Sequence, residues 1–238
     1  TAIIFSIDVS ALICYHFAGS VIPLRMRKKR NLIPRMERCA HVQIKNPEEY
    51  KGRWAQKFPG YRAYHLELGC GKGRFTAEMA GLNPDIFFIA IEIVQEAMVV
   101  AMERACQGEG IRNVRFIEYD ASKIAEIFSP GEISRIYINF CDPWPKKKHA
   151  KRRLTSPGFL KIYRELLAEN GEVWFKTDNA PLFEYSLEQF EKEGWQLREV
   201  TRDLHENGPS GVMTDYEVKF VSQGVKINRC VAVKPPAF

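Results

Sequence analysis

The sequence predicts an α/β fold in which a mainly parallel sheet carries helices on both faces. From residue 64 onward, short apolar segments of strand length alternate with longer segments of helical periodicity. A glycine-rich turn, GCGKG at residues 69–73, directly follows the first apolar segment. Repeated strand–helix units of this kind form parallel sheets, because each helix returns the chain to the same end of the sheet.

Three strand–helix units make up the first half of the predicted domain. Their strands cover residues 64–68, 85–92 and 114–119, and their helices cover residues 74–80, 94–107 and a short segment ending at 128. Gly108 and Gly110 end the second helix, since glycine is common where helices stop. The pattern therefore predicts three neighbouring parallel strands.

The second half continues the alternation and then closes with strands. Residues 136–140 and 172–177 are predicted strands, and residues 158–168 and 182–193 are predicted helices. The first of these helices is expected to stop at Asn170 and Gly171. Residues 197–200, 216–223 and 227–232 are predicted as further strands at the end of the domain.

Length and composition are typical of a soluble globular chain with one large domain. The 238 residues are 45% hydrophobic and 27% charged, with a formal net charge of +6 that is compatible with an acidic partner. We divide the chain into an apolar extension at 1–25, an N-terminal arm at 26–60 and the domain at 61–238. The extension is either a membrane anchor followed by cations or sequence foreign to a native chain that begins at Met26, and we favour the second interpretation.

The six cysteines are scattered, and neither they nor the five histidines show metal-ligand spacing. Free thiols are typical of the reducing cytoplasm, so the sequence predicts a cytoplasmic protein without a metal site. Cys141 is next to Asp142, but the sequence offers no nearby histidine in a triad-like pattern that would activate the Cys141 thiol. We therefore predict a packing role for this thiol.

Acids follow several of the predicted strands, and this pattern indicates a cofactor site. Glu67, Glu92 and Asp120 stand at the ends of the first three strands, beside the turn that contains Gly69 and Gly71. Carboxyl ends of strands hold the ligands of open α/β sheets. Repeated carboxylates would repel a pyrophosphate but suit S-adenosylmethionine, which carries a sulfonium and an ammonium group. The chain resembles the seven-stranded, Rossmann-like class I methyltransferases, with a NAD-type dehydrogenase as the competing interpretation.

The fourth strand leads into the run NFCDPWPKKKHAKRR at residues 139–153. Two prolines stiffen the turn that presents Asp142 beside Trp144. A dense block of cations follows at once, and such a block attracts the phosphates of a nucleic acid. The alternative for the cations is a solvated charged loop, and Trp144 is predicted either to stack on a base or to form a wall of the site.

The motifs DPWPKKKHAKRRL at 142–154, FKTD at 175–178 and TDYEVKF at 214–220 resemble those of the bacterial tRNA (guanine-N7-)-methyltransferase family. The segment NPEEYKGRW at 46–54 also resembles the N-terminal part of that family. The likeness extends from about Met26 to the C-terminal region. It implies methyl transfer from S-adenosylmethionine to N7 of the guanosine at position 46, in the variable loop of tRNA.

The resemblance also implies a role for individual residues, with Asp142 as the catalytic residue. The residues implied to bind or shape the cofactor site are Glu67, Gly69, Gly71, Glu92, Asp120 and Asp142. Those implied to contact the substrate nucleoside or its surroundings are Lys146, Asp178, Thr214, Asp215, Tyr216 and Glu217. Those implied to contact RNA are Lys148, Lys151, Arg152 and Arg153. We expect tRNA as the partner, no DNA, no obligate protein partner, and a monomer or homodimer.

Guanine N7 is an acceptor with a free lone pair and no proton. A strong general base is therefore not required, and Asp142 is expected to orient the base and stabilise charge. How Asp142 and Asp178 divide this work stays open. Two alternatives remain: methylation of an exocyclic amine in DNA, RNA or protein, and an RNA-binding module that has kept the fold without catalysis.

Overall fold

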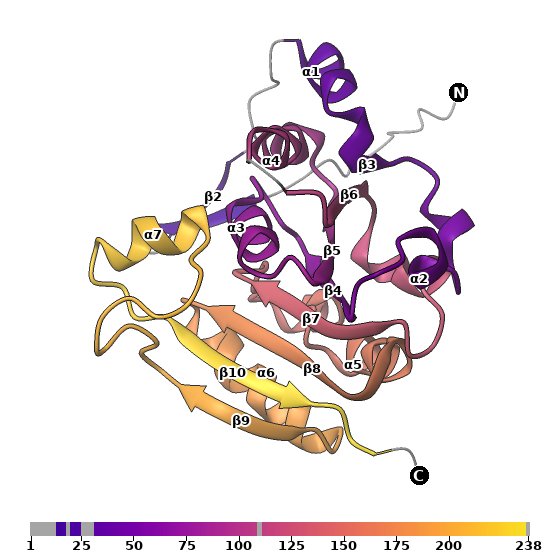
Figure 1. Cartoon of the computed structure of the whole chain (residues 1–238). Helices are drawn as coiled ribbons and strands as arrows, with labels where there is room; N and C mark the ends of the chain where they lie inside the picture. The colour runs from indigo at the N-terminus through magenta and orange to yellow at the C-terminus, as the bar shows by residue number, and fades with distance from the viewer. Residues whose placement is uncertain (1–12, 18–19, 25–30, 109–110, 237–238) are drawn as a thin grey trace, which may run out of the picture.

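The structure is a computed structural model that describes residues 13–17, 20–24, 31–108 and 111–236 (Figure 1). Its elements in chain order are β1 (Ile13–Phe17), β2 (Ser20–Leu24), α1 (Leu32–Arg38), η1 (Ala40–Val42), β3 (Gln43–Ile44), η2 (Pro47–Tyr50), α2 (Trp54–Lys57), β4 (Ala63–Leu68), α3 (Arg74–Leu82), β5 (Ile86–Glu92), α4 (Gln95–Gln107), β6 (Val114–Glu118), η3 (Ala121–Glu126), β7 (Ile133–Asn139), η4 (Lys147–Arg152), α5 (Pro157–Leu166), β8 (Leu167–Thr177), α6 (Ala180–Lys192), β9 (Gln196–Thr201), α7 (Asp215–Val221) and β10 (Asn228–Val233).

The predicted apolar extension is described only in part, because residues 1–12, 18–19 and 25 lie outside the described ranges. Its described segments are the strands β1 and β2, which pair antiparallel as a two-stranded sheet. Within the described ranges, every helix is too short or too polar to cross a bilayer.

The main sheet has eight strands in the order β3-β6-β5-β4-β7-β8-β10-β9. The strands from β3 to β8 are parallel, and β10 runs antiparallel to both of its neighbours. The chain moves outward from β4 through β5 to β6 and then returns to the other side of β4 as β7. Strand order therefore reverses between β4 and β7, and ligands of such sheets bind at this reversal point, beyond the carboxyl ends of the strands.

The predicted α/β class with a mainly parallel sheet is confirmed. The resemblance implied seven strands, and the sheet has eight because β3, in the predicted N-terminal arm, pairs with β6 through Gln43 and Ile44. The helix predicted at 158–168 ends earlier, at Leu166. The chain passes directly into β8, so Asn170 and Gly171 lie within an 11-residue strand and do not end the helix.

The predicted strand at 216–223 is wrong, since residues 215–221 form the helix α7. Thr214 caps this helix, because its hydroxyl accepts a hydrogen bond from the Glu217 amide at 3.0 Å and the Glu217 carboxylate accepts one from the Thr214 amide at 3.2 Å. Alternating apolar residues indicated a strand, but Tyr216 and Phe220 also stand four residues apart. In the helix their rings stack with centroids 4.1 Å apart.

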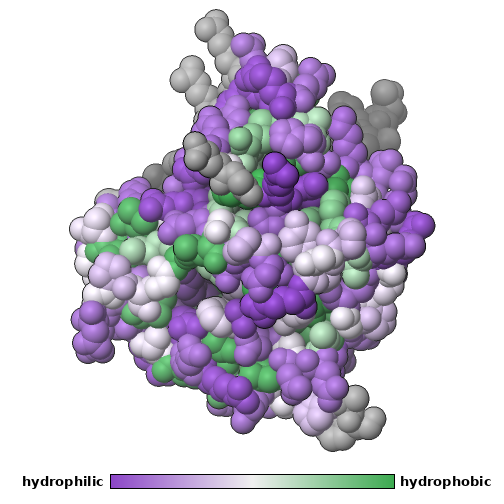
Figure 2. Space-filling model, viewed as in Figure 1, coloured by the Kyte–Doolittle hydropathy of each residue, from purple (hydrophilic) through white to green (hydrophobic). Residues whose placement is uncertain are grey.

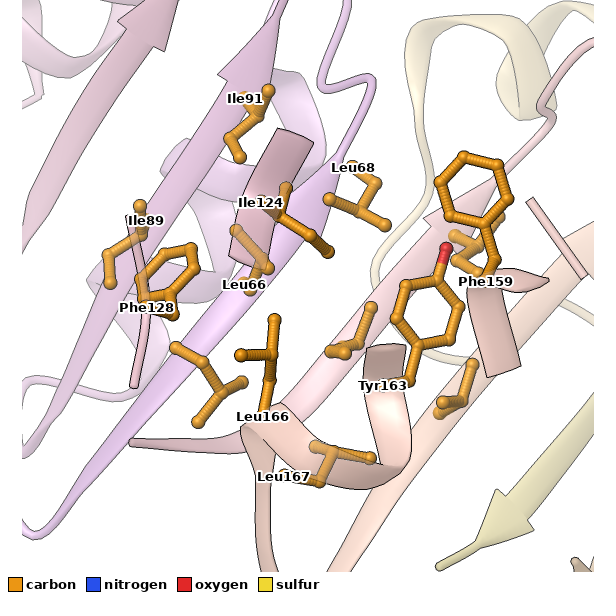
Figure 3. Close-up of a cluster of buried hydrophobic side chains, with 14 of the residues drawn as sticks. Leu66, Leu68, Ile89, Ile91, Ile124, Phe128, Phe159, Tyr163, Leu166 and Leu167 are labelled. Carbon is orange, nitrogen blue, oxygen red and sulfur yellow. The ribbon is translucent and has the colours of Figure 1, made fainter. Parts of the chain in front are cut away.

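Buried side chains alternate between the two faces of the sheet, as the pleat of a strand requires. In β5, Phe88 and Ala90 pack with α1, α3 and α4, whereas Ile89 and Ile91 pack on the other face with η3 and α5. Figure 3 shows the second cluster, where Leu66 and Leu68 of β4 lie near Ile124 and the α5 side chains. Both faces are buried, so the strands are rigid supports for residues at their ends.

Gly73, at the end of the glycine-rich turn after β4, lies very close to α4. Its φ is +71°, and a Cβ built there would lie 2.4 Å from Cβ of Ala101. The start of α3 can approach α4 this closely only because residue 73 has no side chain.

We expect Gly73→Ala to lower the free energy of unfolding by about 2–4 kcal/mol, because left-handed strain and overpacking act together. Gly131→Ala is the matched control, since Gly131 has a φ of +76° and open space around its Cβ position. The control should cost only about 1 kcal/mol. Urea denaturation measures both values, and equal losses would show that the approach to Ala101 contributes nothing.

Candidate active site

The glycine turn after β4 opens onto free space and is tied to the end of β5. Gly69 and Gly71 have φ values of +75° and +55°, and a Cβ built at either position would meet nothing within 4 Å. The Gly71 amide donates to Oε2 of Glu92 at 2.8 Å, and the Val94 amide donates to Oε1 at 2.9 Å. The structure thus brings together three of the predicted cofactor residues and leaves room for a ligand beside them.

Glu67 lies inside the same edge of the sheet, with only 3% of its surface exposed. Its carboxylate accepts hydrogen bonds from the Thr76 hydroxyl and, at 2.9 Å, from Nδ2 of Asn139. Burial raises the pKa of Glu67, and these two hydrogen bonds oppose the rise. Thr76 and Asn139 were not predicted from the sequence, although Asn139 is the last residue of the strand that precedes the Asp142 turn.

Asp142 follows β7 in a turn whose flanking residues are held in unusual backbone conformations. Phe140 and Trp144 have φ values of +54° and +41°, which strain non-glycine residues. The Phe140 amide donates to the Lys176 carbonyl at 2.9 Å. Arg153 donates to the carbonyls of Pro143 and Trp144, each at 3.0 Å. These hydrogen bonds fix the turn, so the structure gives Arg153 a supporting role there, and its predicted contact with RNA stays a prediction.

Asp142 and Glu92 interact as like charges. Burial raises the pKa of Glu92, the nearby charge of Asp142 adds to the rise, and hydrogen bonds from backbone amides oppose it. Two close carboxylates attract a cation placed between them. The structure therefore places Asp142 beside Glu92, one of the predicted cofactor residues, as the sequence indicated.

Asp178 and Tyr216 meet beside this turn, although they are 38 residues apart in the chain. The Tyr216 hydroxyl donates to Oδ2 of Asp178 at 3.2 Å, and the Tyr216 ring lies 5.0 Å from the Phe140 ring between centroids. In Figure 2, hydrophobic side chains gather over α7, and the surface is hollowed between this helix and the tip of β7. The site therefore has one wall from α7.

The other residues of the predicted substrate segment hold α7 in place. Asp215 forms a two-pronged ion pair with Arg104 of α4, at 2.5 and 3.0 Å. Glu217 is completely buried and binds Lys176 and His205. Thr214 caps the helix. Substrate contacts of Thr214, Asp215 and Glu217 stay predictions, and the contacts observed for them are structural.

Asp120 and Ile93 border the same edge. Asp120 follows β6, is exposed, and accepts a hydrogen bond from the Ser122 amide at 2.8 Å. Ile93, which follows Glu92, has 55% of its surface exposed although it is large and apolar. An apolar side chain beside the acids offers a surface for a flat ring, and sequence analysis did not single it out.

The cations after the turn form the exposed helical turn η4. Exposed side chains of this block are Lys146, Lys147, Lys148, Lys151 and Arg152. The Arg152 guanidinium lies 5.0 Å from the centroid of the Trp144 ring, and the His149 ring meets Trp144 edge-on at 5.7 Å. The basic surface is therefore continuous with the Asp142 turn.

These features fit a positively charged nucleoside cofactor. Glu67, Glu92 and Asp142 place negative charge where a sulfonium or ammonium group would be stabilised, and they would repel a pyrophosphate. Gly69 and Gly71 leave open space beside these acids. The residues present therefore match S-adenosylmethionine better than a dinucleotide.

Comparisons with known proteins agree with this geometry. Residues 61–230 match the family model described as "Putative methyltransferase". A tRNA (guanine-N(7)-)-methyltransferase of Brevibacillus brevis is 49% identical over 191 residues, which cover 79% of this chain and 89% of that protein. Another from Streptococcus suis is 44% identical over 210 residues, which cover 88% and 99% of the two chains.

Solved structures share the fold at low identity. The 16S rRNA methyltransferase KamB has a TM-score of 0.60 and 14% identity, over 78% of this chain and 94% of that chain. A 16S rRNA (adenine(1408)-N(1))-methyltransferase mutant from Catenulisporales acidiphilia, solved with the cosubstrate SAM, has a TM-score of 0.54 and 14% identity, over 80% and 94%. These likenesses establish a methyltransferase fold.

The Cys141 thiol provides a test of whether this site contains a nucleophilic cysteine. Burial raises the pKa of Cys141 to about 12, and the Asp142 charge contributes. The thiol is therefore protonated at about pH 8, and the thiolate is the reactive form. We expect iodoacetamide to leave Cys141 unmodified in the native protein, as read by peptide mass mapping. Unfolded protein is the control, and rapid alkylation of native Cys141 would contradict the packing role.

Proposed function

The chain belongs to the tRNA (guanine-N(7)-)-methyltransferase family, and on that premise we propose that it transfers a methyl group from S-adenosylmethionine to N7 of a guanosine in tRNA. We propose position 46 of the variable loop as the target. The observation that carries the proposal is the Asp142 turn, which lies beside Glu92 on one side and leads into the basic turn η4 on the other.

S-adenosylmethionine supplies a methyl group on a positively charged sulfur. The acidic set Glu67, Glu92 and Asp142 favours binding of this cation at the carboxyl edge of the sheet. Backbone amides of Gly71 and Val94 hold the Glu92 carboxylate, whose oxygens can each accept more than one hydrogen bond and so can also bind a ribose hydroxyl. We expect the side chains of Ile93 and Asp120 to border the adenine.

The protein's main task is to position the base, because guanine N7 has no proton to remove. N7 becomes positively charged as it is methylated. Asp142, at the end of β7, stabilises that charge and orients the guanine without acting as a strong base.

Asp178 and Tyr216 supply the contacts that select guanine. The Asp178 carboxylate is an acceptor for guanine N1-H and the exocyclic amine, whereas adenine N1 carries no proton. Tyr216 donates to Asp178 and so orients it. Lys146, exposed at the start of η4, is placed to contact the nucleoside or its phosphate.

Lys148, Lys151 and Arg152 of η4 bind the tRNA backbone. N7 lies in the deep major groove of A-form RNA, so a target in a loop is more accessible than one in a helix. Five cysteines are free thiols, which supports the cytoplasmic location that we propose: Cys39, Cys70, Cys106, Cys141 and Cys230.

Product identity tests the proposal directly. Unmodified tRNA is incubated with S-adenosylmethionine that carries a labelled methyl group, digested and analysed as nucleosides. We expect N7-methylguanosine, and cleavage after borohydride and aniline locates it in the chain. A methylated exocyclic amine, or no methylation, would overturn the proposal.

We expect Asp142→Ala to lower the rate of tRNA methylation by about a hundredfold or more, because a stabilising group at the reacting atom is lost. The circular dichroism spectrum and the midpoint of urea unfolding should stay close to those of the wild type. Glu165→Ala, which removes an exposed carboxylate of α5, is the control and should be fully active. Near-normal turnover by the Asp142 variant would contradict its catalytic role.

Neutralising Lys148, Lys151 and Arg152 to glutamine should weaken tRNA binding and flatten its salt dependence by about two to three units of log–log slope. Arg153 is left intact because it supports the Asp142 turn. The control neutralises Lys45, Lys57 and Lys123, which are exposed elsewhere and remove the same net charge. An equal loss in both triple variants would show that overall charge, and not η4, binds the tRNA.

A further inference from the structure

Lys176 joins three parts of the site from within β8, where only 8% of its surface is exposed. Its carbonyl accepts the hydrogen bond from the Phe140 amide, at the start of the Asp142 turn. Its Nζ donates to the Val212 carbonyl at 3.0 Å and to Oε2 of Glu217 at 2.6 Å. One residue therefore holds the turn through its backbone and the segment before and within α7 through its side chain.

Glu217 receives three hydrogen bonds and has no exposed surface. Its Oε2 accepts from Lys176 and from the Thr214 amide, and its Oε1 lies 2.9 Å from Nε2 of His205. The Ser210 amide donates to Nδ1 of His205 at 3.1 Å, so Nδ1 is an acceptor and Nε2 carries the proton that is donated to Glu217. The Glu217 carboxylate thus binds His205 and the Thr214 amide directly, and it is linked to Ser210 through His205.

Lys176 also faces the cofactor side. Burial raises the pKa of Glu67, and the positive charge of Lys176 opposes that rise. Glu217 and Glu67 in turn offset the cost of burying the ammonium group. The Nζ lies 5.3 Å from the centroid of the Phe75 ring, which belongs to the helix after the glycine turn. A neutral replacement would leave Glu217 buried without its cation, and such charges are unfavourable.

We propose that Lys176 is a positioning residue, which fixes the segment 203–217 against the Asp142 turn, and that Glu217 acts through Lys176 and His205 and does not touch the guanosine. This inference rests on the proposed function for its kinetic consequences. Its structural part, the order of the segment 203–217, can be measured without substrate. The nucleoside-contacting role that the family resemblance implies for Glu217 would require breaking contacts that leave its carboxylate with no exposed surface.

Hydrogen exchange of the full chain, without ligand, tests the structural part. The variants are Lys176→Met, Glu217→Gln and the double variant, with Lys161→Met as the matched control because Lys161 is an exposed lysine of α5. We expect exchange in residues 203–217 to speed up by about tenfold or more in the first three proteins, while amides of β4 and β5 are unchanged. The control should match the wild type.

Steady-state kinetics test the consequence for the reaction. We expect KM for tRNA to rise by about tenfold in Lys176→Met and in Glu217→Gln, and the double variant to be no worse than either, because the two residues act as one unit. If Glu217 instead touches the guanosine, Glu217→Gln lowers kcat with normal exchange, and Lys176→Met has little effect. That result, or normal exchange in Lys176→Met, overturns the inference.

The two proposals fail in different ways. Absence of tRNA methylation by the wild type would refute the proposed function, while exchange in 203–217 would still decide the placement of Lys176. If Lys176→Met does not fold, the double variant decides, because it removes the charge of Glu217 together with that of Lys176. Faster exchange of 203–217 in that variant supports the inference, and unchanged exchange contradicts it.

Discussion

The buried carboxylate of Glu67 is the group on which the arrangement of the site depends. It joins three elements that are distant in the chain, since Thr76 of α3 and Asn139 of β7 donate to it and the charge of Lys176 in β8 acts on it. A buried carboxylate is costly unless it has such partners. The reversal of strand order between β4 and β7 brings these partners to one edge of the sheet. The same strand order therefore both satisfies the Glu67 carboxylate and forms the site.

Different strands of this edge hold the proposed cofactor and substrate residues. In the function that we propose, the ends of β4 and β5 supply the acids and the open glycine turn for the cofactor. The ends of β7 and β8, with α7, supply Asp142, Asp178 and Tyr216 for the base. Lys176 links the two halves, because its ammonium group pairs with Glu217 and faces Glu67. We propose that the exposed basic turn η4, which follows the Asp142 turn, adds affinity for a polyanion.

Local patterns predicted most of the fold and the residues at strand ends, because alternation, glycines and terminal acids are visible within a few residues. The helix α7 was missed because Tyr216, Val218 and Phe220 alternate as in a strand, and only the cap at Thr214 distinguishes the two. Contacts between residues far apart in the chain could not be predicted from local patterns. Asn139 reaches Glu67 across 72 residues and Lys176 reaches Glu217 across 41. The bonds from Arg153 to the Asp142 turn likewise depend on the folded path of η4.

Selection of a cationic cofactor by the acids at this edge of the sheet is the claim on which the rest depends, and a binding titration measures it most directly. The wild-type chain is titrated by calorimetry with S-adenosylmethionine and, separately, with NAD. We expect saturable binding of one S-adenosylmethionine per chain and no detectable binding of NAD, because Glu67, Glu92 and Asp142 attract a sulfonium and repel a pyrophosphate. Binding of NAD without binding of S-adenosylmethionine would contradict this explanation of the site.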